Sequence, residues 1–360
     1  MKNVLHIRSS FDAGGTETLL LHLFNYKQNY FNIHLALIKD GRLIKDLSNS
    51  ENHYYKFFRK RFFDLFVIRE LYQVIKTNSI SIIHTHQEIE LFYAVMLKLK
   101  KPDIKIFHSV HLLNFERNWT FYLEIFLVNF AEKIIAVSQT VKDHLIAKGY
   151  ASDKIIVIPN AVSLPEKVSH NDIIKFKEKI NYSRENFVVL MIGNFREEKD
   201  QLTLLKAFNL LRNDYPQIKL VFIGKDNEFA EPCKKMTLKE DLNTRVFYVG
   251  ELENASKYIP CCDVFVYSTK SETFGIAVVE ALLQKKTVIA SDIDAMIELS
   301  KNGKYFTLFE TGNAKDLAEK IKHFIDNGIK AEKIKKSYQY AVTNFSYEKF
   351  IKNLSDIYFQ

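Results

Sequence analysis

Short apolar runs alternate with longer amphipathic stretches along the chain. In its first half, apolar runs lie near 3–7, 33–38, 80–84, 104–109, 133–137 and 155–158, and stretches with helical spacing cover 16–28, 63–78, 88–99 and 139–148. Strand-like runs that alternate with helical stretches are typical of βαβ units in a parallel sheet. This pattern predicts a doubly wound α/β domain over residues 1–165.

The same alternation begins again after a polar, lysine-rich stretch that contains Pro165. Further strands are expected near 187–193, 220–224, 246–250, 263–267 and 287–290, with a helix over 275–285. A last helix over 347–359 places Phe350, Leu354 and Ile357 at helical spacing. We therefore predict a second α/β domain over 166–345, followed by a separate helical segment, 346–360.

The composition is that of a globular protein, with 360 residues, 47% hydrophobic and 26% charged. No run of eighteen apolar residues and no signal-peptide pattern occurs, so we expect a cytoplasmic protein. Its three cysteines, Cys233, Cys261 and Cys262, are odd in number and lack C-x-x-C spacing. They are expected to be reduced residues that pack in the interior.

Positive charge is concentrated in the first half of the chain. Residues 1–165 hold 21 Lys and Arg against 15 Asp and Glu, so they carry +6 of the net charge of +8. Nucleic acid, an anionic membrane surface or an acidic acceptor could each account for this bias.

The most informative stretch is 263–290, which predicts a strand, a polar loop, a helix and another strand. It contains two glutamates, Glu272 in the loop and Glu280 in a helix that is apolar on all sides. A buried carboxylate needs hydrogen-bond donors, and the vicinal hydroxyls of a ribose would supply two. A single helical glutamate more often points to solvent or pairs with lysine. Backbone amides at the start of this helix would favour a phosphate.

Residues 271–281 resemble the E-x7-E signature of the retaining glycosyltransferases of family 4, the group 1 enzymes of GT-B fold. Other motifs match in the same order along the chain: Gly14, Gly15 and Glu17 resemble the G-G-x-E loop, 158–162 the I-P-N-G-V turn, and Lys199 the lysine of G-R-L-x-x-x-K. The resemblance implies two Rossmann-like domains that face a cleft, with the C-terminal helix crossing back to the first domain.

The resemblance also implies a division of labour, in which the second domain binds a nucleotide-sugar donor and the first binds the acceptor. Glu272 would hold the sugar hydroxyls, Glu280 the ribose, Lys199 the diphosphate, and His111 would position the sugar; of these, Glu272, His111 and Lys199 would be catalytic. Further donor contacts are expected from Gly15, Asn194, Arg196, Gly224, Val249, Thr273, Phe274, Gly275 and Ile276.

One departure from the family pattern concerns the diphosphate site. Asn194 occupies the position of the family's arginine, and Arg196 stands two residues later. Arg196 is the candidate substitute for that arginine, and the alternative is an ordinary surface cluster of charges at 196–199.

No metal and no other cofactor is expected. His84, His86, His108 and His111 lie near strand ends without a carboxylate at ligand spacing, and His84 and His86 are expected to be satisfied core residues. The short D-x-D at 292–294 matches a metal signature of a different glycosyltransferase fold and is interpreted as coincidence.

The sequence thus predicts a retaining, metal-independent hexosyltransferase. A UDP-sugar is the favoured donor, and the acceptor would be a saccharide or a lipid-linked molecule in surface polysaccharide or glycoconjugate biosynthesis. The alternatives are a GT-B-fold nucleotide-sugar epimerase or phosphorylase, and a basic nucleic-acid-binding module. Nucleic acid is not expected as a partner, because no helix-turn-helix, RNP or OB signature occurs.

A final prediction concerns residues 54–66, which interleave four cations with aromatic and leucine side chains. Such a segment suits the inner face of an anionic membrane, where the enzyme would bind peripherally. The alternative is that Phe62, Phe63 and Phe66 form the core face of an ordinary helix.

Overall fold

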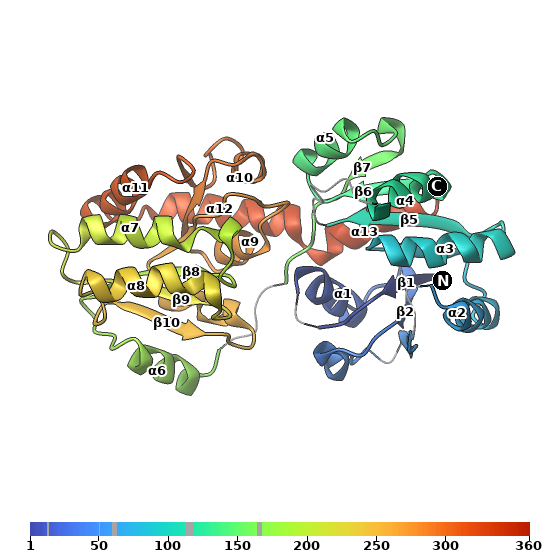
Figure 1. Ribbon diagram of the computed structural model, residues 1–360, viewed down its shortest axis with the longest axis horizontal. Coiled ribbons are helices and arrows are strands. Elements are labelled where there is room, and N and C mark those ends of the chain that lie inside the picture. The colour runs from blue at the N-terminus through green and yellow to red at the C-terminus, as the bar shows by residue number, and fades with distance from the viewer. Residues whose placement is uncertain (13, 50, 60–62, 112–118, 164–167) are drawn as a thin grey trace. The chain divides into compact units, whose positions relative to one another are not determined.

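The computed structural model describes residues 1–12, 14–49, 51–59, 63–111, 119–163 and 168–360 (Figure 1). Contacts divide the chain into two compact units. Unit 1 comprises Met1–Ala161 and Phe345–Gln360, and unit 2 comprises Val162–Asn344. The sequence placed these boundaries at 165/166 and 345/346.

Unit 1 contains a seven-stranded parallel sheet in the order β3-β2-β1-β4-β5-β6-β7. Its strands are β1 (Lys2–Arg8), β2 (Phe31–Leu37), β3 (His53–Lys56), β4 (Ile82–Thr85), β5 (Lys105–Val110), β6 (Lys133–Ala136) and β7 (Ile155–Val157). Its helices are α1 (Gly15–Asn25), α2 (Leu65–Thr77), α3 (Glu88–Lys100), α4 (Trp119–Leu127), α5 (Gln139–Ala147) and α13 (Tyr347–Tyr358).

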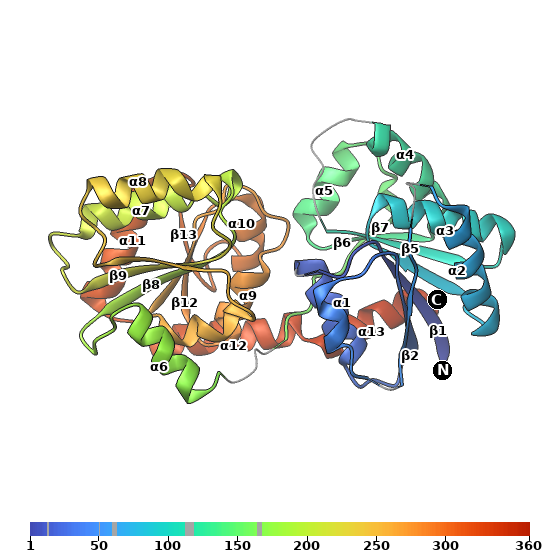
Figure 2. The ribbon, with the colours of Figure 1, turned by 60° about the horizontal axis from the view of Figure 1, so that its bottom comes forward.

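The last helix of the chain completes the core of unit 1. Side chains of α1 and α13 pack with Val4, Ile82 and Phe107 in one hydrophobic cluster. Figure 2 shows α2 and α3 on the other side of the sheet. Side chains alternate between the two faces along a strand, so residues two apart share a face. This alternation determines which histidines meet at the site described below.

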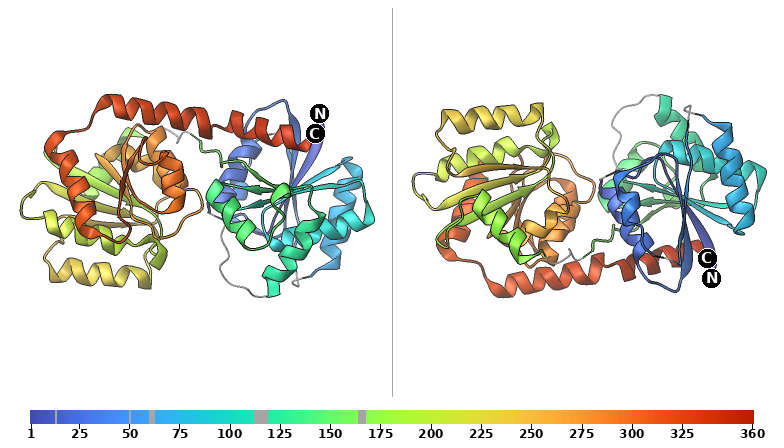
Figure 3. Two further views of the ribbon diagram at one scale, coloured as in Figure 1. Left: turned by 90° about the horizontal axis from the view of Figure 1, so that it is seen from above. Right: turned by 90° about the horizontal axis from the view of Figure 1, so that it is seen from below.

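Unit 2 contains a six-stranded parallel sheet in the order β10-β9-β8-β11-β12-β13. Its strands are β8 (Phe187–Ile192), β9 (Ile218–Ile223), β10 (Val246–Gly250), β11 (Val264–Tyr267), β12 (Thr287–Ser291) and β13 (Thr307–Phe309). Its helices are α6 (His170–Lys179), α7 (Gln201–Leu211), α8 (Glu231–Lys239), α9 (Ile276–Leu283), α10 (Asp294–Ser300), α11 (Ala314–Asn327) and α12 (Ala331–Phe345). Figure 3 shows helices on both faces of each sheet.

Each sheet has one point where the strand order reverses, between β1 and β4 in unit 1 and between β8 and β11 in unit 2. In open parallel sheets, ligands bind outside the carboxyl ends of the strands at such a point. The fold therefore indicates one candidate region in each unit.

Two elements of unit 1 were not predicted. The edge strand β3 is short and mostly exposed, and α4 is apolar on several faces, with Tyr122 and Phe126 exposed. Neither segment shows the periodicity that makes a strand or helix readable from sequence. Within the described ranges, no helix is long and apolar enough to cross a membrane.

Candidate active site

Lys199, Tyr267 and Glu272 form a hydrogen-bonded cluster at the switch point of unit 2. Lys199 Nζ donates to Glu272 Oε2 at 2.8 Å and to the Tyr267 hydroxyl at 2.6 Å, and that hydroxyl donates to Glu272. Lys199 ends the single-turn helix that follows β8, whereas Tyr267 ends β11 and Glu272 lies in the loop after it. The fold thus brings together two predicted catalytic residues that are 73 positions apart.

The cluster keeps Glu272 ionised although its side chain is only 18% exposed. Burial alone would raise the pKa of this carboxyl, but the charge and hydrogen bond of Lys199, the hydrogen bond from Tyr267 and that from the Thr273 amide lower it below its usual value. Burial and the neighbouring Glu272 carboxylate raise the pKa of the Tyr267 phenol well above its usual value. The site therefore holds a positive ammonium beside a negative carboxylate near pH 7.

Glu280 lies in α9 and is half-buried. Burial raises the pKa of its carboxyl to about 7, and a hydrogen bond with Ser256 offsets only part of this effect. No ion pair with Glu280 occurs in the part of the chain that the structure describes. The carboxylate thus lacks the lysine partner of the alternative interpretation and is suited to hydroxyl donors from a ligand.

The loop between Glu272 and α9 is built around Gly275, the residue that precedes the first helical turn. Gly275 has a φ of 93°, in the left-handed region, and a Cβ there would lie 2.5 Å from the Met296 side chain. Phe274 is buried, whereas Thr273 and Ile276 are half-buried. The left-handed backbone at this position therefore favours glycine, whereas the end of the Met296 side chain could move aside for a Cβ.

A second backbone contact shapes the ends of β8 and β9. A Cβ at Gly224 would lie 2.1 Å from the Gly193 carbonyl oxygen, and the Asn194 side chain accepts a hydrogen bond from the Lys225 amide at 2.8 Å. Asn194 therefore ties two strand ends together. Nearby, the Val249 carbonyl accepts a hydrogen bond from Lys179 Nζ at 2.7 Å.

Arg196 is exposed, and its guanidinium lies 3.6 Å from the Glu198 carboxylate. An exposed pair of this kind contributes little to stability. The structure thus brings Lys199 and Glu272 together, but leaves Arg196 in the surface charge cluster that was its alternative interpretation.

In unit 1, Arg8 is buried between two carboxylates at the corresponding strand end. It donates to Glu17 of α1 at 3.0 Å through Nε and to Glu90 of α3 at 3.0 Å. Glu90 also accepts from the Ser9 amide and hydroxyl and from the His86 amide, at 2.7–2.9 Å. This network holds the start of α1, which begins at Gly15, against the ends of β1 and β4.

Histidines from three neighbouring strands stack beside this network. His6 and His84 are register partners on β1 and β4, and His86 and His111 follow on the same face after β4 and β5. His84 contacts the Ser109 hydroxyl at 2.7 Å and the Tyr358 hydroxyl of α13. His84 and His86 are thus satisfied core residues, as expected.

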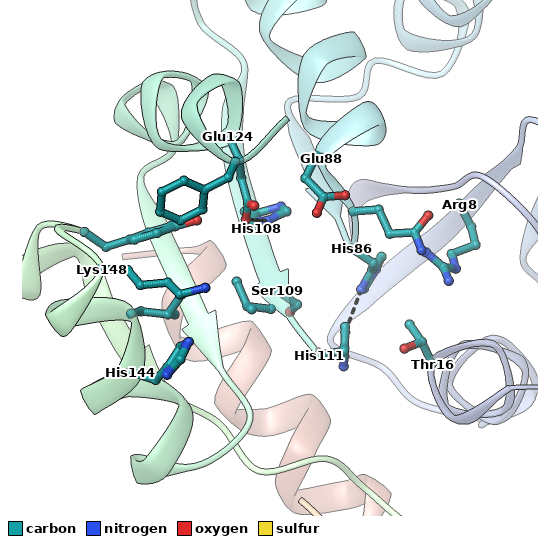
Figure 4. A pocket seen from close by; sticks show the side chains of 15 residues that line it. Arg8, Thr16, His86, Glu88, His108, Ser109, His111, Glu124, His144 and Lys148 are labelled. Carbon is teal, nitrogen blue, oxygen red and sulfur yellow. Dashed lines mark hydrogen bonds and ion pairs between the residues drawn. The ribbon is translucent and has the colours of Figure 1, made fainter. Parts of the chain in front are cut away.

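His86 and His111 also line a pocket of about 100 Å³ at the carboxyl edge of the unit 1 sheet (Figure 4). The other side of the pocket carries His108, whose Nε2 lies 3.4 Å from the Glu124 carboxylate. His144 of α5 and Lys148, which follows that helix, also lie there. The pocket is further lined by Arg8, Thr16, Gln87, Glu88, Ser109, Val110, Phe121, Leu145 and Tyr150. Carboxylates, hydroxyls and an aromatic ring in one small pocket suit a polar ligand such as a sugar.

Two groups of side chains are possible metal ligands, and in each at least one member is hydrogen-bonded to other protein groups. One nitrogen of each of His6, His84 and His86 lies within 4.8 Å of the others, but the rings are stacked and both nitrogens of His84 are hydrogen-bonded. Asp292 accepts hydrogen bonds from the Thr311 amide and hydroxyl at 2.8 and 2.7 Å, and Asp294 begins α10. The absence of a metal stays a prediction, tested below.

Sequence reasoning missed Tyr267, Arg8, Glu90 and His6. Tyr267 was interpreted as one of the apolar residues of its strand, and Arg8, which follows the predicted strand at 3–7, was not singled out. His84 and His86 are two positions apart, which indicated that they share one face of the sheet. That His6 lies on the same face could be known only from the pairing of β1 with β4.

Comparison with solved structures identifies the fold. HepE from Anabaena, solved in complex with UDP and glucose, superposes with a TM-score of 0.84 at 20% sequence identity over 99% of both chains. Sucrose-phosphate synthase from Thermosynechococcus elongatus superposes with a TM-score of 0.77 at 16% identity over 99% of this chain and 98% of that one. The fold is that of the GT-B glycosyltransferases.

Sequence comparison then gives the family. The family profile described as Glycosyl transferases group 1 matches residues 172–339, and that of Glycosyltransferase Family 4 matches residues 13–165. EpsD of Bacillus subtilis, which carries a provisional glycosyltransferase name, is 24% identical over 311 residues, covering 82% of this chain and 80% of EpsD. The chain belongs to the group 1 glycosyltransferases of family 4.

Proposed function

We propose that this glycosyltransferase moves a hexose from a UDP-sugar to a saccharide or lipid-linked acceptor, with retention of the anomeric configuration. The acceptor would belong to surface polysaccharide or glycoconjugate biosynthesis. The UDP and glucose bound to HepE support this donor, although they were observed in that protein.

The cluster of Lys199, Tyr267 and Glu272 carries this proposal. The ammonium of Lys199 would stabilise the negative charge that develops on the leaving diphosphate. Glu272 would exchange its bond with Lys199 for sugar hydroxyls and stabilise the positive charge that develops at the anomeric carbon.

The pocket of unit 1 supports a polar acceptor. Glu88 and Glu124 can accept hydrogen bonds from hydroxyls, and Phe121 offers an apolar ring to a sugar face. His111 and Thr16 line the same pocket. The family resemblance assigns donor contacts to His111 and to Gly15, the neighbour of Thr16.

Slow hydrolysis of the donor tests the proposal without knowledge of the acceptor. The protein is incubated with UDP-glucose, UDP-galactose and UDP-N-acetylglucosamine, and released UDP is measured. Release from at least one UDP-hexose, with the freed sugar first appearing in the donor's anomeric configuration by NMR, is the expected result. Inverted sugar, or conversion of one UDP-sugar to another without release of UDP, would contradict it.

We expect this hydrolysis to survive chelation of divalent cations. Lys199 and the amides at the start of α9 supply positive charge to the diphosphate, and Asp292 is engaged with Thr311. Rates with EDTA and with added Mn²⁺ should agree within about twofold, and Asp292→Asn should behave like the wild type. Loss of activity in EDTA, restored by Mn²⁺ in the wild type but not in Asp292→Asn, would show that the D-x-D motif holds a catalytic metal.

We also propose that unit 1 binds the cytoplasmic face of an anionic membrane through residues 54–66. Phe58, Leu65 and Phe66 are 70–76% exposed, so the alternative in which Phe66 serves the core is wrong. Phe63 is 43% exposed. Lys60, Arg61 and Phe62 lie outside the described residues. Exposed aromatic rings beside cations favour the headgroup region of a bilayer.

A relative supports a lipid acceptor: alpha-monoglucosyldiacylglycerol synthase of Acholeplasma laidlawii is 22% identical over 325 residues, covering 82% of this chain and 78% of that enzyme. The lipid in that name refers to the relative and not to this chain.

Flotation with liposomes should separate the contributions of charge and apolar surface. Binding is expected with anionic lipid at low salt and should weaken at high salt, since each cation near the surface contributes about 1 kcal/mol. Changing Arg59, Lys60 and Arg61 to Ser should reduce binding at least tenfold, and Phe58→Ser with Phe66→Ser should also reduce it.

The matched control for this experiment is Leu210→Ser with Leu238→Ser, which removes exposed apolar side chains from unit 2. This variant should float like the wild type. Wild-type protein that remains entirely in the unbound fraction at low salt with anionic lipid would refute membrane binding.

A further inference from the structure

Acidic side chains outnumber basic ones at the pocket of unit 1. Apart from histidines, the ionisable residues of opposite sign that line it are Glu88, Glu124, Arg8 and Lys148. Arg8 is already paired with two further buried carboxylates, those of Glu17 and Glu90. Together with these two partners, the pocket holds four formal negative charges and two positive charges.

The histidines of the pocket do not reverse this balance. Burial lowers the pKa of His111 to about 3 and that of His86 well below its usual value. Burial and the charge of Lys148 also lower the pKa of His144. These three rings are therefore neutral near pH 7, and a proton on His108 would still leave a net negative charge. Residues 112–118, which lie outside the described ranges, contain one acid and one base and so add no formal net charge.

Glu124 of α4 is held from two sides. His108 Nε2 lies 3.4 Å from one of its carboxylate oxygens, and the Tyr150 hydroxyl is hydrogen-bonded to it. The other ring nitrogen of His108 lies 2.8 Å from the Thr85 hydroxyl, so the ring is fixed as well. A carboxylate has about four sites for hydrogen-bond donors, so these two neighbours leave room for hydroxyl groups of a ligand.

Glu88 faces the same pocket from the first turn of α3 without such support. It is half-buried and makes no hydrogen bond or ion pair within the part of the chain that the structure describes. Burial raises the pKa of the Tyr150 phenol, and the charges of Glu124 and Glu88 raise it further, so both carboxylates act on the same region. Figure 4 shows Glu88, Glu124 and Lys148 reaching the pocket from different elements. A helix start alone favours an acid, but it does not explain why this acid faces a second one across a pocket.

We propose that this pocket selects an uncharged sugar as the acceptor and excludes acceptors that carry an anionic group at that end. Glu88 and Glu124 would accept hydrogen bonds from sugar hydroxyls, whereas a carboxylate or phosphate in the same place would meet like charge. The excess positive charge of residues 1–165 is therefore not gathered at this pocket. Of the three explanations for that excess, an acidic acceptor becomes the weakest.

Matched pairs of methyl glycosides test this selection without a donor. Methyl glucoside is paired with methyl glucuronide, and methyl galactoside with methyl galacturonide, so the members of a pair differ only by a hydroxymethyl group or a carboxylate. Affinities for the full-length protein are measured by NMR titration near pH 7 at constant ionic strength. The neutral member of at least one pair should bind about tenfold more tightly than its uronide, because like charges a few ångströms apart repel by at least this much. A uronide that binds as tightly as its neutral partner, or no binding by any neutral glycoside, would overturn the proposal.

Glu88→Gln should lower the preference for the neutral glycoside about threefold to tenfold, mainly because the uronide binds better. The change keeps the shape of the side chain and breaks no described hydrogen bond, so the melting temperature should stay the same. Glu70→Gln is the matched control, since it makes the same change in net charge at an exposed position of α2. It should keep the wild-type preference. Equal preferences in the wild type, Glu88→Gln and Glu70→Gln would show that the pocket's charge does not set the selection.

The word acceptor rests on the proposed function, and a second measurement tests it. A neutral glycoside that binds should be glycosylated when a UDP-hexose is added, whereas the matching uronide should not. Binding without glycosylation, by enzyme that hydrolyses the donor, would contradict the acceptor role. Failure to release UDP from any UDP-hexose would instead count against the proposed function, because the binding preference is measured in the absence of a donor.

Discussion

Glu272→Gln should slow sugar transfer by a factor of about 10²–10³ while leaving UDP affinity unchanged or raised. Removing one group that stabilises charge in a transition state typically costs this much in kcat. UDP affinity should not fall, because the carboxylate that now neutralises Lys199 at 2.8 Å would be gone and the ammonium could interact fully with the diphosphate. The measurements are UDP titration by calorimetry and single-turnover transfer at saturating donor.

Lys199→Met is the paired variant, because it removes the opposite charge from the same cluster. It should weaken UDP binding roughly 10–100-fold, the range for hydrogen bonds to charged groups, and slow transfer as well. Tyr267→Phe removes one hydrogen bond without changing the charge, so it controls for disturbed packing and should affect both quantities less. Similar loss of UDP affinity in Glu272→Gln and Lys199→Met, with turnover of the bound complex unchanged, would refute these roles.

UDP-sugar affinity should rise with pH between about 6 and 8, and Glu280→Gln should abolish this dependence. Burial raises the pKa of Glu280 to about 7, so near pH 6 the carboxyl is mostly protonated. Ribose hydroxyls donate to the ionised form, and binding must then release a proton. Below the pKa, affinity should fall by up to about tenfold per pH unit. A UDP-sugar is the suitable ligand, since its diphosphate does not titrate in this range.

The raised pKa of Glu280 also affects the stability of the protein without a ligand. A carboxyl whose pKa rises on folding contributes less stability as pH increases from about 4.5 to about 7, because ionisation is resisted only in the folded state. Glu280→Gln should therefore unfold at a higher temperature than the wild type at pH 8, but not at pH 4.5.

Glu280→Ala should weaken UDP binding at every pH. A wild-type affinity for the UDP-sugar that does not change with pH would contradict the proposed ribose contact.

The sequence was most informative where function depends on local spacing. Glu272 and Glu280 lie eight positions apart in one loop and helix, and the glycine between them is required by a left-handed backbone. Lys199 could be predicted from its motif, although its contact with Glu272 could not. That contact depends on β8 lying beside β11, a pairing of distant segments that alternation of strands and helices does not specify.

Residues that act through distant partners were the ones that sequence reasoning missed. Arg8 and Glu90 are 82 positions apart, and the burial of each charge is explained only by its contact with the other. Tyr267 differs from a phenylalanine, such as Phe265 in the same strand, by a single hydroxyl. That hydroxyl matters only because Lys199 and Glu272 lie within hydrogen-bond distance of it. A buried polar group can be recognised from sequence only when its partner is also visible there.

The position of α13 in the core of unit 1 has a consequence for how the chain folds during synthesis. Tyr358 lies 1% exposed among residues of the first sheet, yet the ribosome makes it after the whole of unit 2. Unit 2 is a continuous segment and can fold as soon as it has emerged, whereas unit 1 must keep an apolar face uncovered until the last helix arrives. Domains of nascent chains usually fold from the amino end. Here the order of completion is reversed, and the first residues made belong to the last domain finished.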